Sequence, residues 1–484
     1  MYYRTHHLDS DPLPFTRSTR VLLGLVAAGF FMQTLDSTIV NTALPAMAHS
    51  LHESPLRMQS VVIAYSLTLA LLIPASGWLA DRFGTRSTYV TALLLFVLGS
   101  ALCAAAPTLS LLVAARVLQG IGGAMLLPVG RLAVLRSVPR PQYLQAMSVV
   151  TIPGLVGPLI GPTLGGWLSE YSSWHWIFLI NIPIGLLGAT ATFRFMPQSR
   201  PAGLERFDVG GFAMIAVAMV SISLALDGVS ELHFQLSVVM LLFVVGLAAL
   251  SAYWLHAAQW ARPLFAPALF RIPTFGIGLL GNLFARIGAG SVPFLLPLML
   301  QVGLGYTPAH AGVMLIPTAA AGIIVRWFVV PLVAAWGYRR VLVVNTALLG
   351  VCIVGLGLIS AGQPPWVRIV QLALFGAINS VQFTVMNTLT LKDLTPALAS
   401  SGNSLLSTVQ MSSMSFGVAG AAALLTSFTQ LLEATRPESL LRGFHATFLT
   451  VGLITTASAW IFGQLSGEVR GRGETEESVV VPPP

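Results

Sequence analysis

Long apolar stretches recur along nearly the whole chain, and short polar segments separate them. A helix needs about 20 mainly apolar residues to cross a membrane. Fourteen stretches meet this length: 21–43, 58–80, 88–106, 109–130, 141–166, 174–196, 209–227, 235–255, 273–299, 309–333, 338–360, 366–390, 402–428 and 445–466. The pattern predicts an all-α integral membrane protein with fourteen transmembrane helices, the fifth of them rich enough in glycine and proline to be broken.

The composition agrees with a membrane protein. Of the 484 residues, 55% are hydrophobic and 9% are charged, whereas soluble proteins have about 25% charged residues. The first apolar stretch follows twenty mainly polar residues and is too long for the core of a signal peptide. We therefore expect it to stay in the protein as a transmembrane helix.

Several classes of function are excluded by missing patterns. Lys392 is the one lysine and follows Leu391, so a phosphate-binding glycine–lysine loop is absent and no ATP site is expected. No cysteine and histidine residues have the spacing of metal ligands, and Cys103 and Cys352 lie in different apolar stretches. The net charge of +8 is spread over loops, which argues against a nucleic-acid surface.

Basic residues alternate between the two sides of the predicted membrane. If the N-terminus is cytoplasmic, eighteen of the 25 lysines and arginines fall in inner segments, Arg131 and Arg136 among them. Four fall in outer loops (Arg57, Arg368, Arg436 and Arg442) and three within spans (Arg116, Arg286 and Arg326). Because cytoplasmic loops retain lysine and arginine, we expect both termini in the cytoplasm.

A short internal repeat suggests two related halves. The segments 83–86 (Phe-Gly-Thr-Arg) and 336–339 (Trp-Gly-Tyr-Arg) occupy the same place if the seventh and eighth spans are an insertion. Such repeats are typical of secondary transporters. The predicted organisation is 6+2+6: a cytoplasmic segment 1–20, a six-helix bundle 21–196, a linker with two extra helices 197–271, a second six-helix bundle 272–466 and a disordered cytoplasmic tail 467–484.

Two charged residues at equal depth predict a buried ion pair. Asp36 and Arg116 each lie about seven residues from the outer end of their spans, or roughly 10 Å at 1.5 Å per residue. Ionisable groups within a bilayer are costly and indicate function. Asp36 could load and release a proton as its surroundings change; the alternative is a static pair that locks two helices together.

A third charge, Arg286, lies near the middle of the ninth span and has no carboxylate partner in its half of the sequence. Guanidinium groups match carboxylates in geometry, so Arg286 is a candidate for binding an anionic group of a substrate. The alternative is a structural bond to backbone carbonyls. Arg326 lies nearer the cytoplasmic end of its span and could reach the headgroups.

Two glycine-rich segments have a recognisable spacing. The inner loop contains Gly77, Asp81, Arg82, Gly84 and Arg86, where glycine permits a tight turn and Asp81 can bond a neighbouring helix end; a plain turn with positive charge on the inner side is the alternative. In the fifth span, Gly157, Gly161 and Gly165 lie on one helical face and permit close helix contact, and the prolines kink the helix. The residues of this run are Gly157, Pro158, Gly161, Pro162, Gly165 and Gly166.

These segments resemble motifs of the major facilitator superfamily. The loop at 77–86 is similar to its signature between the second and third helices, 116–124 to its fourth-helix motif, and the fifth-span run to the motif of its antiporters. The segments 36–45 and 174–185 resemble the fourteen-helix drug:proton antiporter branch. The resemblance extends over all fourteen predicted spans.

The resemblance implies a proton-driven exporter of small amphiphilic molecules in the bacterial inner membrane, with two bundles around a central cavity. Asp36 and Arg116 would couple protons to transport, Asp81 and Arg82 would belong to a cytoplasmic gate, and the fifth-span run would form the seam between the bundles. Candidates for substrate binding are Arg286, Asn41 and Gln119. No cofactor, metal or ATP-binding subunit is expected, and we expect a monomer.

One departure from the family pattern leaves the substrate open. Members that expel cationic drugs often have further carboxylates in their later helices, and this sequence has Arg286 instead. Export of an organic anion, such as citrate or a metal–citrate chelate, is the alternative. A membrane sensor or scaffold that transports nothing is a hypothesis of another class. An intramembrane enzyme lacks a catalytic set within the spans, and a channel lacks a ring of like charges.

Overall fold

The computed structural model describes residues 15–53, 57–200, 206–230, 235–261, 263–360, 362–431 and 437–465, and these residues form helices and connections without a strand among them. Helix is present in every one of the fourteen predicted ranges. The predicted tail at 467–484 and most of the predicted N-terminal segment lie outside the described residues. Within the latter, helix already begins at Arg17, four residues earlier than predicted.

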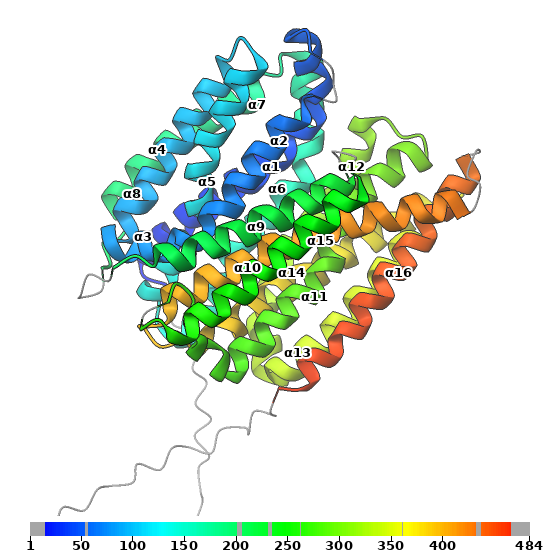
Figure 1. Cartoon of the computed structure of the whole chain (residues 1–484). Coiled ribbons are helices and arrows are strands. Elements are labelled where there is room, and N and C mark those ends of the chain that lie inside the picture. Colours follow the sequence, from blue (N-terminus) through cyan, green and yellow to red (C-terminus); the bar gives the residue numbers. More distant parts are fainter. Residues whose placement is uncertain are drawn as a thin grey trace, which may run out of the picture.

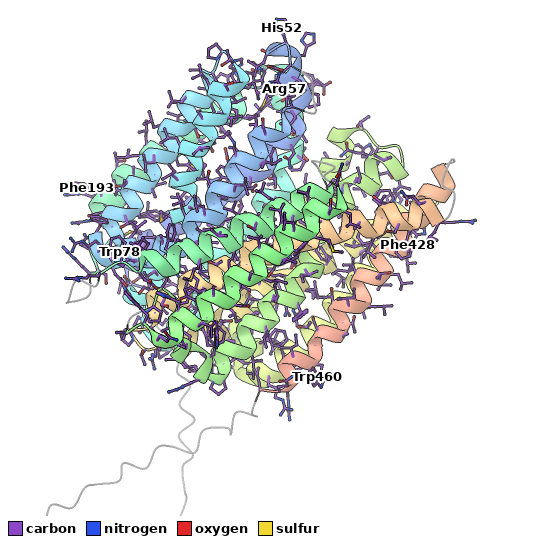
Figure 2. The ribbon with its side chains drawn as sticks, in the orientation of Figure 1. His52, Arg57, Trp78, Phe193, Phe428 and Trp460 are labelled. Carbon is purple, nitrogen blue, oxygen red and sulfur yellow. The ribbon has the colours of Figure 1, made fainter. Side chains whose placement is uncertain are left out.

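The N-terminal half, residues 15–200, is built from helices that pack side by side (Figure 1). Its elements are α1 (Arg17–Ser50), α2 (Gln59–Leu72), η1 (Ile73–Ala75), α3 (Ser76–Phe83), α4 (Thr85–Ala104), α5 (Leu109–Ser137), η2 (Arg140–Gln142), α6 (Tyr143–Tyr171), α7 (Trp176–Leu179) and α8 (Asn181–Phe195). Figure 2 places His52 and Arg57 at one end of this half and Trp78 at the other, so α1 and the α2–α3 segment run the length of the bundle.

The C-terminal half, residues 272–465, repeats this style of packing in the lower part of Figure 1. Its elements are α11 (Pro273–Leu298), η4 (Met299–Gly303), α12 (Pro308–Ile324), α13 (Arg326–Gly357), α14 (Pro365–Lys392), α15 (Ala399–Leu431) and α16 (Pro437–Gly463). One hydrophobic cluster includes residues from both halves, from Leu22 and Tyr89 to Phe275 and Leu406. The two halves therefore share part of one core.

Between the halves, α9 (Val209–Ser230) and α10 (Leu236–Gln259) form a pair that packs against α2 and α15, and η3 (Pro267–Arg271) follows. The loop after α10 is held at two points by Tyr253, whose hydroxyl donates to Phe265 O (3.1 Å) and accepts from Phe265 N (2.6 Å). Ser401 of α15 donates to Leu264 O (2.9 Å) and accepts from Ala266 N (3.3 Å). The extra pair is thus connected to the beginning of α15.

By length and apolarity, twelve helices of the described residues could cross a membrane, and thirteen if α6 counts as one bent span. The bend of 45° in α6 separates Arg140–Pro158 from Ile160–Tyr171 and agrees with the predicted break in the fifth span. The predicted span 309–333 corresponds to α12, which has 17 residues, and the first turns of α13.

The two segments of the internal repeat share a backbone conformation. Gly84 has φ 86° and ψ 152°, and Gly337, where α13 is interrupted, has φ 71° and ψ 161°. Positive φ is open to glycine and strained for other residues. The glycine of each repeat therefore allows the same sharp connection between a short helix and the next long one.

The glycine face of α6 packs against α1 of the same half. A Cβ atom added to Gly157 or Gly161 would overlap the hydroxyl of Thr34 or Thr38, and one on Gly165 would overlap the carbonyl oxygen of Ile39. Gly166 is not part of this face, because open space surrounds it. The predicted close approach is confirmed for the three spaced glycines, with α1 as the partner helix.

Another face of α6 meets the C-terminal half. Thr163 occupies the space that a side chain at Gly312 of α12 would need, and the hydroxyls of Thr151 and Thr384 are 3.0 Å apart. Helix α6 therefore lies between α1 and the other half. Helix α6 thus lies at the contact between the halves, where the seam was predicted. Its three spaced glycines, however, pack against α1 within the same half.

Candidate functional site

The structure brings Asp36 and Arg116 together as a buried ion pair. Asp36 comes from the middle of α1 and Arg116 from the second turn of α5, and their side chains are 0% and 1% exposed. Arg116 Nη1 donates to Asp36 Oδ2 at 2.7 Å, and its Nε donates to Val61 O at 3.3 Å. The guanidinium also lies 4.1 Å from the ring centre of Tyr65. The predicted pair is present, and water is excluded from it.

Two amides complete the surroundings of the Asp36 carboxylate. Gln119 Nε2 and Asn181 Nδ2 donate to Asp36 Oδ1 at 2.8 Å and 3.0 Å. Gln119 also donates to Ser100 Oγ (2.7 Å) and accepts from Arg116 Nη1 (2.6 Å). Asn181, at the beginning of α8, was not singled out by sequence reasoning; an asparagine within an apolar span is the signal that could have found it.

Both oxygens of the Asp36 carboxylate have donors in this arrangement. Asp36 accepts three hydrogen bonds, one of them from a guanidinium. Removing one partner of a buried ion pair costs about 3–5 kcal/mol because the other charge is left without a partner. The donors of Asp36 belong to α5 and α8, so a movement of these helices relative to α1 would change its hydrogen bonds.

The other predicted residue of this region is separate from the pair. Asn41 lies five residues further along α1 and is exposed, so it does not belong to the buried network. Gln119 is part of the network and 0% exposed, which places it beside the ion pair rather than in a position open to substrate. The substrate-binding roles predicted for both stay predictions.

On the predicted cytoplasmic side, Asp81 connects three helices. Arg136 Nη2 of α5 donates to Asp81 Oδ1 at 2.5 Å, and Ser400 Oγ of α15 donates to Asp81 Oδ2 at 2.5 Å. Asp81 lies near the end of α3, so one carboxylate bonds both its own half and the other half. The backbone of Gly77 approaches Ser400 O and Ser404 Oγ too closely to admit a side chain.

Further bonds between the halves surround this carboxylate. Ser76 and Ser404 hydroxyls are 2.9 Å apart, Asn403 Nδ2 donates to Pro128 O (2.6 Å), and Arg140 donates to Leu394 O (3.3 Å). Ser76, Asn403 and Ser404 are each 1% exposed or less. The halves are therefore closed against each other on this side.

The remaining residues of the loop motif are placed around this contact. Gly84 forms the sharp connection, and a side chain there would overlap Gln198. Arg86 lies 5.8 Å from the ring centre of Phe193 on α8, which Figure 2 shows on the outer side of the N-terminal half. Arg82 is partly buried. A gating role for Arg82 and Arg86 stays a prediction.

Replacing Asp81 by Asn should open this side. The change removes the charge that holds Arg136 and Ser400 together, and bonds to charged groups contribute about 1.5–3 kcal/mol. If the free energy that favours the closed state falls by roughly 1.4 kcal/mol, the population of the open state rises about tenfold. The measurement uses a cysteine substituted for Ser404, a residue that faces the other half. Opening of this side is seen as faster maleimide labelling of that cysteine in the purified protein.

Ser400→Ala is the matched control, since it removes one bond and keeps the charge, and it should accelerate labelling by a smaller factor. Equal labelling rates in the Asp81→Asn and parent proteins would show that Asp81 does not hold this side closed.

The structure corrects the position predicted for Arg131 and Arg136. Both were assigned to an inner loop, but α5 continues to Ser137 and includes them. Arg131 is 0% exposed, and its Nη2 donates to Gln410 Oε1 of α15 at 2.9 Å. Helix α5 extends past the apolar stretch because its last turns pack against α15 and α3 rather than lipid.

Arg286 lies near the middle of α11 and contacts side chains. Its Nε donates to Asn282 Oδ1 at 3.4 Å, and its guanidinium lies 3.9 Å from the ring centre of Phe383 on α14. Its Nη2 is enclosed and has no partner among the described residues. The predicted alternative, a bond to backbone carbonyls, is not among the contacts of Arg286 in the described part of the chain.

Two packed helical halves, a buried ion pair within one of them and a closed contact between them define a multi-pass membrane transporter. Residues 26–418 match the profile of the Major Facilitator Superfamily, and the chain belongs to this family. Members of this family are transporters rather than enzymes and use no cofactor.

Similar bacterial proteins support this assignment. The chain is 50% identical over 451 residues to the "Putative multidrug resistance protein MdtD" of Pectobacterium carotovorum subsp. carotovorum (strain PC1), covering 93% of this chain and 97% of that protein. It is 49% identical over 455 residues to the protein of the same description from Salmonella heidelberg (strain SL476), covering 94% and 96%.

Solved structures share the fold at low sequence identity. The human organic anion transporter MFSD10 (TETRAN) matches with a TM-score of 0.65 and 14% identity, covering 92% of this chain and 99% of that one. The proton:xylose symporter XylE matches with a TM-score of 0.63 and 12% identity, covering 92% and 95%.

Proposed function

We propose that this protein exports small amphiphilic molecules in exchange for protons. The observation that carries this proposal is the Asp36 carboxylate, which is 0% exposed and is held by one guanidinium and two amides. The relatives described as multidrug resistance proteins support export of such molecules. We further propose fourteen spans, a cavity between the two halves, and cytoplasmic termini in a bacterial inner membrane.

In this proposal, proton exchange follows the movement of the two halves. When the outer side opens, loosening of the contacts from Gln119 and Asn181 lets a proton neutralise Asp36, and Arg116 is released. When the inner side opens, Arg116 returns and the proton leaves, because a nearby guanidinium lowers the affinity of a carboxylate for protons. The bonds of Asp81 would close the inner side between these events.

A second candidate keeps the mechanism and changes the substrate to an organic anion. The observation that favours it is the charge of Arg286. Its guanidinium takes part in none of the ion pairs that the described residues form. A cationic drug would be repelled by this charge in the absence of a nearby carboxylate. Citrate or a metal–citrate chelate would supply the missing negative charge.

The test uses inside-out vesicles that are acidified by respiration and contain a pH-sensitive dye. A lipophilic cation is added to one sample and citrate to another. Recovery of the dye signal with the cation supports drug export, and recovery with citrate alone supports export of an anion. No recovery with either compound, in vesicles shown to contain the folded protein, would contradict proton antiport of both classes.

A further inference from the structure

A second buried polar cluster lies where the two halves meet. Arg131 of α5 contributes from the N-terminal half, and Asn282, Arg286, Asn387 and Gln410 contribute from α11, α14 and α15 of the C-terminal half. Arg131, Asn282 and Asn387 are each 0% exposed, Gln410 is 5% exposed, and Arg286 is half-buried. This polar cluster is separate from the Asp36 pair and is not explained by it.

Gln410 connects the members of the polar cluster. Its Oε1 accepts from Arg131 Nη2 at 2.9 Å. Its Nε2 donates to Asn387 Oδ1 at 2.5 Å and to Asn282 Oδ1 at 3.1 Å. The same Asn282 oxygen accepts from Arg286 Nε at 3.4 Å, so the chain of bonds runs from one arginine to the other.

The polar cluster has an excess of donors. The side-chain oxygens of Gln410, Asn387 and Asn282 already accept bonds from within it. Four enclosed donor atoms nevertheless have no partner in the described part of the chain: Arg131 Nε, Arg131 Nη1, Arg286 Nη2 and Asn387 Nδ2. A buried donor without an acceptor costs about 1–3 kcal/mol. The described part of the chain supplies no acceptor for these four atoms, so their partner would be a bound water or a ligand.

The charge of the polar cluster points to the same kind of partner. It contains two guanidiniums, and the ion pairs formed by the described residues include neither of them. Uncompensated charge within a membrane protein is expensive, and it marks a substrate or ion pathway. A ligand that carries two negative charges would balance these two guanidiniums.

Apolar surface beside the charges favours an organic ligand over a simple ion. Arg286 lies over the ring of Phe383, which stacks on Phe30 of α1 with ring centres 6.3 Å apart. Only Phe383 contacts the arginine directly, and the two rings come from opposite halves. A carbon skeleton between two acidic groups could pack here, whereas inorganic phosphate would leave the rings unused.

We propose that Arg131, Arg286, Asn387 and Gln410 form a binding site for a small dicarboxylate, with one carboxylate on each arginine. Guanidinium and carboxylate groups bond in a planar, two-pronged geometry. As a transport site, it rests on the export function proposed above. Because Arg131 and Arg286 belong to different halves, the bound dicarboxylate would link the halves on the side where they are closed.

The experiment measures binding directly on the purified full-length protein, without a proton gradient. Thermal unfolding is followed through the fluorescence of the ten tryptophans at constant ionic strength. The probes are succinate, its uncharged analogue succinamide, and inorganic phosphate. We expect succinate to raise the melting temperature in a saturable way, as a ligand of the folded state does, and succinamide to have no effect.

Variants assign the effect to the polar cluster. Arg131→Gln and Arg286→Gln should each weaken succinate binding at least tenfold, and Arg286→Lys should weaken it less because the charge is kept. Arg326→Gln is the matched control, since Arg326 contacts the neighbouring Trp327 ring at 4.7 Å instead of this cluster, and its succinate binding should be unchanged. If the Gln variants do not fold, the proposal is still tested by succinate binding to the Arg286→Lys variant and by the response of the parent protein to the three probes.

Three results would overturn the proposal: no response of the parent protein to succinate, an equal response to succinamide, or a response to phosphate without one to succinate. A normal succinate response in Arg286→Gln would also overturn it. None of these results depends on proton movement. A failure of this site is therefore distinguishable from a failure of proton antiport in the vesicle assay.

Discussion

Asp36→Asn should reduce proton-coupled export to the background of empty vesicles. The amide keeps the size of the side chain but carries no proton that can be lost, so exchange at this position stops in both directions. A second carboxylate is not among the partners of Asp36 in the described part of the chain, which are a guanidinium and two neutral amides, so no neighbour there can take over its role. The measurement is the substrate-induced recovery of the dye signal in acidified inside-out vesicles.

Asp393→Asn is the matched control for this experiment. Asp393 follows α14, is 46% exposed and bonds Thr274 at 2.7 Å, so its neutralisation leaves the buried pair intact. Its vesicles should respond as the parent protein does. Dye recovery at the parent rate in Asp36→Asn vesicles, with equal amounts of protein in the membrane, would refute the coupling role.

Arg116→Gln should destabilise the protein more than any change at a surface charge. The variant leaves the Asp36 carboxylate buried with only amide donors, and loss of one partner from a buried pair costs about 3–5 kcal/mol. Surface pairs such as Arg57 with Glu53 contribute about 0–1 kcal/mol. We expect a low yield of monodisperse protein and a clearly lower melting temperature for Arg116→Gln, and near-parent values for Arg57→Gln.

The double variant Asp36→Asn with Arg116→Gln separates stability from coupling. Both charges are removed together, so much of the loss in melting temperature should be recovered, as expected for partners in contact. Proton-coupled export should stay absent, because the titratable group is gone. If the double variant were no more stable than Arg116→Gln alone, the ion pair would not be the cause of the destabilisation.

The sequence was sufficient to predict the ion pair, because depth in the membrane is a one-dimensional property. Counting residues from the ends of two apolar stretches placed Asp36 and Arg116 at one level, and the structure brings them to 2.7 Å. The glycine spacing of the fifth span predicted close contact in the same way, since a period of four follows one helical face. The partner helix, α1, could not be predicted from that period.

Arg131 shows where such reasoning fails. An arginine after a stretch of apolar residues suggests a loop at the membrane surface, yet α5 continues beyond it and buries it against Gln410 of α15. These two residues are 279 positions apart in the sequence, and no local pattern connects them. The polar cluster around Arg286 was therefore predicted only in part, as one arginine without a partner.

The number of spans shows a different limit. Hydropathy predicted fourteen spans, whereas twelve helices of the described residues, or thirteen with the bent α6, are long and apolar enough to cross a membrane. The predicted boundary between 309–333 and 338–360 does fall at Gly337, where α13 changes direction. The boundary between helices is set by one glycine in a positive-φ conformation rather than by polar residues. Gly84 sets the boundary between α3 and α4 in the same way. A hydropathy average does not record backbone conformation, so it cannot place such boundaries.

Helices α9 and α10 cannot be removed without affecting the contact between the two halves. Tyr253 of α10 holds the loop that bonds Ser401, and Ser401 adjoins Ser400, the residue that bonds the Asp81 carboxylate from the opposite half. A shortened derivative without α9 and α10 would keep every residue of both bundles. It would lose Tyr253 and the support that this residue gives to the loop beside Ser401. Any effort to engineer a version without these two helices must therefore replace that support before its transport rates can be compared with those of the parent protein.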